Sequence, residues 1–246
     1  MTFNSSVEIN DPNNAGGSAD ALLVYDLQQA LEIWSGYISG IGTLEVELDI
    51  ASTTQGRESG GPTSSQFVRT NAQGVNIFEP SSLYELTTGN HVSGTTSDIT
   101  ITIDPGYFSQ LDLAANLTYN SQVPTNEYNP IVVDLHELLH GFGQSGYYSQ
   151  TGTLAGNYES TFDTFIEQTS SGTFFTGPNA EAAYGGPVPL TTDSISGENY
   201  YHFGDDLADL SRTPATVQDP LTLDLMNGIV FFTIINTKFP NSISVC

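Results

Sequence analysis

The chain has very few basic residues and only one cysteine. Four of its 246 residues are Lys or Arg, against 28 Asp or Glu, so the formal charge at pH 7 is −24. So few cations cannot neutralise a row of phosphates, which excludes nucleic-acid binding and argues against anionic membrane surfaces. The single cysteine, Cys246, cannot form an intrachain disulfide, so the cysteine content does not indicate a redox compartment.

Long apolar runs are also missing from the sequence. The longest, residues 229–235, is far shorter than the roughly 20 residues that a transmembrane helix needs, so no membrane span is expected. Residues 1–5 contain neither the basic nor the apolar region of a signal peptide. Strong acidity with only 13% charged residues is nevertheless typical of extracellular proteins. We therefore expect a secreted, monomeric protein.

Apolar periodicity in the first half predicts one helix and several strands. Apolar residues recur at helical spacing from Leu22 to Trp34, with Ser18 or Asp20 as the cap and Gly36 near the end. Strict alternation predicts strands, of which the clearest are residues 44–50 and 99–103, with further strand signals over 66–78. The polar segments 2–18 and 52–65 are predicted to be a loosely held arm and a surface loop.

A second helix is predicted to begin at Pro130, since proline suits the first helical turn. It should end among the glycines of residues 141–146. A short helix is predicted over 158–168, and the last apolar segments are 217–226 and 230–235. The fold class is therefore α+β, with a sheet and two helices in an N-terminal lobe, residues 1–143, and an irregular C-terminal lobe, residues 144–246.

The second predicted helix carries the pattern His-Glu-x-x-His. His136 and His140 are four positions apart, so both imidazoles lie on one helix face and can reach the same metal ion. Glu137 lies beside them, close enough to act on a water at the metal without being a ligand. Two of the four histidines in the chain fall in this motif. A catalytic zinc normally takes three protein ligands, so a third must come from elsewhere.

The sequence after the motif resembles the metzincin clan of zinc metallopeptidases, and its leishmanolysin-like branch in particular. Gly143 follows at the metzincin spacing, but Gly146 stands where the short motif has its third histidine. In the leishmanolysin-like branch a long insertion precedes that histidine, and His202 follows His140 by 62 positions. Residues 224–228, around Met226, resemble the clan's Met-turn. Residues 179–190 resemble the insertion of secreted bacterial members, some of which carry calcium-binding repeats.

This resemblance implies the fold, the chemistry and the roles of these residues. The sheet would be twisted and mixed, with the active-site cleft between the two lobes. His136, His140 and His202 would bind Zn²⁺, Met226 would form the floor of the site, and Glu137 would be the general base. The partner would be a protein or peptide substrate. Calcium is a second candidate cofactor in a structural role, although Asp205, Asp206 and Asp209 lack the spacing of a calcium loop.

Two alternatives stay open at this point. Glu159, 19 positions after His140 and followed by Asp163, resembles the third ligand of thermolysin-like gluzincins. The chain could also be an extracellular binding or adhesion module that holds a structural metal without catalysis. The remaining histidine, His91, is interpreted as a loop residue because no ligand-type residue lies near it at a metal-binding spacing.

Overall fold

The computed structural model describes residues 3–149, 151–154, 156–190 and His202. The α+β class is confirmed, with open mixed sheets and few helices. Within these residues no helix is both long and apolar enough to cross a membrane. The expectations for Met226, for the acidic residues 205–209 and for the apolar segments after residue 216 lie outside the described residues.

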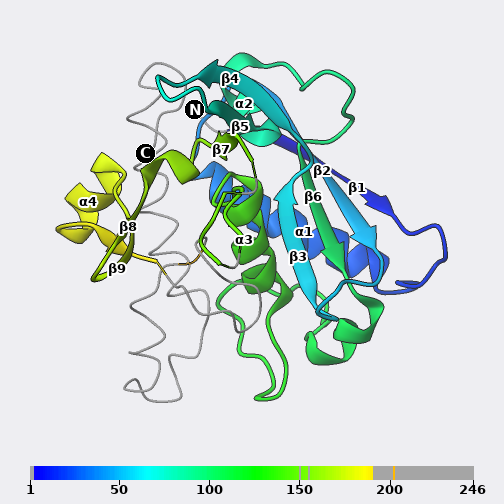
Figure 1. Ribbon diagram of the computed structural model, residues 1–246. Helices are drawn as coiled ribbons and strands as arrows, with labels where there is room; N and C mark the ends of the chain where they lie inside the picture. The colour runs from blue at the N-terminus through cyan, green and yellow to red at the C-terminus, as the bar shows by residue number, and fades with distance from the viewer. Residues whose placement is uncertain (1–2, 150, 155, 191–201, 203–246) are drawn as a thin grey trace.

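The main sheet has four strands in the order β1-β2-β6-β3. The first three are parallel to one another, and β3 is antiparallel to β6 and forms one edge of the sheet. Figure 1 shows β3 beside α3, on the side of the sheet away from β1. The sheet is therefore mixed, with its one antiparallel strand at the edge next to α3. The strands are β1 (Asn4–Asn10), β2 (Thr43–Ile50), β3 (Glu58–Pro62) and β6 (Ile99–Ile103).

The predicted strands of this sheet are confirmed, and two more were missed. In β2 every second residue is buried, as the alternation predicts, and β6 shows the same pattern. The predicted arm contains β1, and the predicted loop over 52–65 contains β3. Both are edge strands that are held by backbone pairing to one neighbour, so their polar or glycine-rich sequences carry little apolar alternation.

Three α-helices lie in the described part of the first 143 residues, one more than predicted. α1 (Asp20–Ser35) and α3 (Pro130–Gly141) begin and end close to the predicted residues. They pack together in the core, where the indole Nε1 of Trp34 donates a 3.2 Å hydrogen bond to the carbonyl of Leu135. The missed helix, α2 (Ser81–Thr88), is short and rich in Ser and Thr, so it has little apolar periodicity.

The predicted helix over 158–168 is wrong. This segment forms β7 (Tyr158–Ser160), a 3₁₀ turn, η2 (Asp163–Phe165), and the start of β8 (Ile166–Thr169). Its aromatic residues recur at a spacing that resembles a helix, but Phe162 and Phe165 both pack on Phe175 of a neighbouring strand. Tertiary packing of the aromatic rings therefore overrides the local pattern.

Two small sheets complete the described structure. β4 (Ser65–Thr70) and β5 (Asn76–Pro80) form a hairpin that is joined by β7, in the order β4-β5-β7. At the left of Figure 1, a second sheet of order β10-β9-β8 lies with α4. The other elements are β9 (Gly172–Phe175), α4 (Pro178–Tyr184), β10 (Val188–Pro189) and the 3₁₀ helix η1 (Pro105–Gln110).

Candidate metal centre

The sequence around α3 defines where this helix begins and where it ends. The side chain of Asn129 accepts a hydrogen bond from the backbone N–H of Ile131, and Pro130 occupies the first helical turn. After the helix, Gly143 adopts a φ of 112°, which only glycine adopts easily. Leu135, Leu138 and Leu139 are buried in the core, whereas His136, Glu137 and His140 are half-buried. The helix therefore holds these three polar side chains at the edge of the core.

The structure brings three histidines together. The Nε2 atoms of His136, His140 and His202 lie 3.2 to 3.3 Å from one another. Nitrogen ligands at about 2.0–2.1 Å from a tetrahedral zinc ion lie roughly 3.3–3.4 Å apart, so this triangle has the size of one face of such a site. Three ring nitrogens converging on one point fit a borderline divalent ion that prefers imidazole.

The protonation state of His140 suits a metal ligand. Its Nδ1 lies 2.8 Å from the carbonyl oxygen of Gln144, which can only accept, so Nδ1 carries the proton and the Nε2 lone pair faces the other histidines. Burial, followed by the neighbouring His202 and His136, lowers the pKa of His140 well below its usual range. His140 is therefore a neutral imidazole, which is the form that binds metals.

Glu137 lies in the same cleft as the three histidines. The cleft has a volume of about 680 Å³ and is bounded by α3, by β3, and by Tyr107 and Tyr128. β3 approaches α3 very closely at Gly60, where a Cβ atom would lie 2.5 Å from the carbonyl oxygen of Glu137. The chain thus places an edge strand directly beside the carboxylate and the histidines.

Gly146 cannot be replaced by the histidine of the short metzincin motif without rearrangement. A Cβ atom at this position would lie 2.1 Å from Oδ1 of Asp163. Oδ2 of the same carboxylate accepts hydrogen bonds from the backbone N–H groups of Tyr147 and Ser160, both at 2.8 Å. Asp163 therefore fixes the turn that leads away from α3.

Glu159, the alternative third ligand, lies on β7 rather than on a helix. Its backbone pairs in parallel with Ile77 of β5. Among the described residues, the group of ligand atoms that contains His136, His140 and His202, all within 4.8 Å of one another, does not contain Glu159. The gluzincin arrangement, in which a helix carries this glutamate, is therefore not the one formed here.

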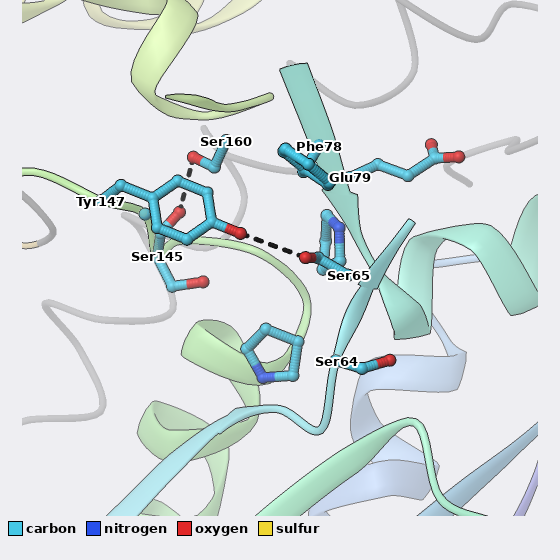
Figure 2. A pocket seen from close by; sticks show the side chains of 10 residues that line it. Ser64, Ser65, Phe78, Glu79, Ser145, Tyr147 and Ser160 are labelled. Atoms are coloured by element: carbon cyan, nitrogen blue, oxygen red, sulfur yellow. Dashed lines mark hydrogen bonds between the residues drawn. The ribbon is translucent and has the colours of Figure 1, made fainter. Parts of the chain in front are cut away.

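A smaller pocket of about 300 Å³ adjoins the cleft and shares Ser145 and Gly146 with it. In Figure 2 the hydroxyl of Tyr147 reaches across to Ser65, with a distance of 3.1 Å between the two oxygens. The ring of Phe78 forms part of the wall, and the hydroxyl of Ser160 donates to the carbonyl of Ser145. The pocket thus combines aromatic walls with hydroxyl groups, next to the C-terminal end of α3.

Three buried carboxyl groups lie on α3 and on two elements packed against it, and they were not identified from the sequence. Asp26 of α1, Glu58 of β3 and Asp134 of α3 are all buried. Burial, reinforced by the negative neighbours, raises the pKa of Glu58 and Asp134 well above the usual range. Burial and the nearby Asp112 raise the pKa of Asp26 to about 7. In sequence each is an isolated acidic residue, so no local signal could have grouped them.

His91 lies in a loop, as interpreted from the sequence, but carboxylates from other parts of the chain surround it. Its ring nitrogens lie 3.4 Å from Glu45, 3.7 Å from Glu85 and 3.3 Å from Asp98. Glu45 and Asp98 are 53 positions apart, so ligand spacing along the chain could not reveal this group. The fold, not the local sequence, brings these side chains together.

Comparisons with models of known protein families, with curated proteins and with solved structures give no match. The function of this chain has to be inferred from the geometry of its own residues.

Proposed function

We propose that this protein is a zinc-dependent endopeptidase. The observation that carries the proposal is the convergence of three imidazole nitrogens, all within 3.3 Å of one another, in a cleft that also contains Glu137. His136, His140 and His202 would hold the ion. A zinc ion in such a site lowers the pKa of a water molecule and polarises the carbonyl of the bond to be cleaved.

Glu137 would act as the general base and then as the general acid. It follows His136 on α3 and lines the same cleft, so its carboxylate would accept a proton from the attacking water. It would then deliver this proton to the departing amine of the substrate. A site with a purely structural metal needs no carboxylate at this position, so Glu137 favours an enzyme over a non-catalytic binding module.

β3 would bind the substrate chain. It is one of the two edge strands of the main sheet, and Ser59 and Gly60 line the cleft beside Glu137. An extended peptide can add to such an edge through backbone hydrogen bonds. The neighbouring pocket next to Ser145 would then receive a substrate side chain close to the bond that is cleaved.

The finer assignments belong to the same proposal. A mixed sheet with an antiparallel edge strand beside the metal-binding helix supports membership of the metzincin clan, with His202 as the third ligand after a long insertion. We propose in addition that the residues around Met226 correspond to the clan's Met-turn, that the protein acts as a secreted monomer, and that calcium has a structural role. Glu159 as third ligand is disfavoured because it lies on β7.

The test is the substitution Glu137→Gln, assayed for casein cleavage and for zinc content. General acid–base groups contribute about 10²- to 10⁴-fold to rate, so activity should fall by this factor while one zinc per chain is retained. Glu167→Gln, at an exposed position on β8, is the matched control and should leave both unchanged. If Glu137→Gln cleaves casein as fast as the unmodified protein, the proposal is wrong.

A further inference from the structure

A second group of potential metal ligands lies where β2 and β6 of the main sheet begin. None of its residues is on an element that carries one of the three histidines. It contains His91, in the loop after α2, and Asp98, directly before β6. One ligand atom from each of these, together with one from Glu45 of β2, lies within 4.8 Å of the other two. Glu85 of α2 lies next to this group, with its Oε2 3.7 Å from Nδ1 of His91.

The carboxylates of this group are held firmly in place. Asp98 is fully buried, and its Oδ2 accepts a 3.0 Å hydrogen bond from the backbone N–H of Glu45. Oε1 of Glu85 accepts a hydrogen bond from the backbone N–H of Thr43, and Gly42 leaves room for this carboxylate, since a Cβ there would lie 2.1 Å from Oε1. The positions of the Asp98 and Glu85 carboxylates are therefore set by the fold before any ion binds.

His91 alone faces three carboxylates, so it can compensate only part of the negative charge of this group. Glu85 is 3% exposed, and its Oε2 is buried without a hydrogen-bond donor; Oε2 of Glu45 is in the same situation. Within the part of the chain that the structure describes, no Arg or Lys forms an ion pair with these carboxylates, and His91 is the only cationic partner. A buried carboxylate oxygen without a donor is costly, so it either takes up a proton or pairs with a cation.

We propose that Glu45, His91 and Asp98, with Glu85 as a fourth ligand, form a second site for a divalent metal ion. Three carboxylates and one imidazole suit a first-row divalent ion such as Zn²⁺ or Mn²⁺, whereas Ca²⁺ takes oxygen ligands almost alone. This site does not depend on the proposed peptidase activity, because it shares no residue with the cleft.

The role of this ion is structural. It would join α2 and the loop after it to the ends of β2 and β6. α2 in turn supports the metal-binding helix, because the buried hydroxyl of Ser82 donates a 2.7 Å hydrogen bond to the carbonyl of Gly141, the last residue of α3. Binding of an ion only to the folded protein raises the melting temperature Tm.

The test uses the full chain with His140→Ala, which disables the three-histidine site, and compares it with the double variant His140→Ala/His91→Ala. His91 is 41% exposed, so its removal leaves no cavity in the core. Asn90→Ala in the same background is the control, because Asn90 is an exposed neighbour whose side-chain amide donates a hydrogen bond to the carbonyl of Thr88, outside the proposed ligand group. Each protein is freed of metal and titrated with Zn²⁺, Mn²⁺ and Ca²⁺ separately, by calorimetry and by thermal unfolding.

We expect the His140→Ala protein and its Asn90→Ala control to bind one equivalent of Zn²⁺ and to show a higher Tm. Addition of His91→Ala should weaken binding by more than the roughly 10- to 100-fold that loss of a second-shell contact causes. Absence of a Zn²⁺-dependent rise in Tm in the His140→Ala protein would overturn the proposal. So would equal Zn²⁺ binding with and without His91. Tighter binding of Ca²⁺ than of Zn²⁺ would overturn the assigned class of ion.

Discussion

The close approach of β3 to α3 makes Gly60 sensitive to substitution by any larger residue. A Cβ atom at this position would lie 2.5 Å from the carbonyl oxygen of Glu137, 2.7 Å from its Cβ and 2.8 Å from its carbonyl carbon. Two of these three atoms belong to the helix backbone, so no side-chain rotation can relieve the clash. Gly60→Ala must therefore move β3 and α3 apart.

The expected loss of stability follows from the cost of an overpacked contact, about 1–3 kcal/mol. For a protein of this size this corresponds to a decrease in Tm of about 2–12 °C. Because the shifted atoms belong to Glu137, casein cleavage should also fall, and a displacement of about 1 Å can cost 100-fold in rate.

Gly61→Ala is the matched control. Gly61 is the next residue of β3 after Gly60, so the same change is made in the same strand. A Cβ atom at Gly61 would have no heavy atom within 4 Å. Urea unfolding and casein cleavage should therefore be close to those of the unmodified protein. If Gly60→Ala matched Gly61→Ala in both assays, the close packing of β3 on Glu137 would be refuted.

Three further predictions concern the metal and the buried acids. His202→Ala should lose most of its zinc affinity at neutral pH, whereas Glu159→Ala should retain the metal. Equilibrium dialysis with zinc analysis distinguishes the two variants. The reverse pattern would favour a gluzincin site. Removal of metal by a chelator should lower Tm, and added Zn²⁺ should restore it; an unchanged Tm would argue against metal binding by the folded state.

The third concerns Asp26. Its folded pKa of about 7, raised by burial and by Asp112, exceeds the ordinary value of 3.8, so the folded state binds the proton more tightly and stability is lost as pH rises from 4 to 7. Asp26→Asn should remove this loss and be more stable at pH 8 by up to about 4 kcal/mol. Equal slopes of unfolding free energy against pH in the two proteins would contradict the assignment.

Local patterns in the sequence predict the elements that bury a regular apolar face. The alternation around Leu48 corresponds to β2, in which every second residue is buried in the core. The helical spacing around Leu135 corresponds to α3, in which the apolar residues at every third or fourth position are buried. Edge strands such as β1 and β3 and the short helix α2 lack such a face. They are held by backbone pairing and by single hydrogen bonds such as that of Ser82, which no periodicity reveals.

The same distinction applies to the sites. His136, Glu137 and His140 lie within five residues on one helix, so their spacing alone predicts a common site. The position of His202 in that site was predicted from a resemblance, not from spacing. The group around His91 could not be predicted at all. Its carboxylates belong to Glu45 on β2, Glu85 on α2 and Asp98 just before β6, and only the fold brings these elements together.

X-ray absorption at the zinc edge tests the central claim most directly. The protein would carry His91→Ala, so that the proposed second site is disabled, and one equivalent of Zn²⁺. The account predicts three imidazole ligands at about 2.0–2.1 Å, together with one light atom from water, and two imidazoles after the further substitution His202→Ala. A first shell of two imidazoles and a carboxylate in the protein that still contains His202 would contradict it.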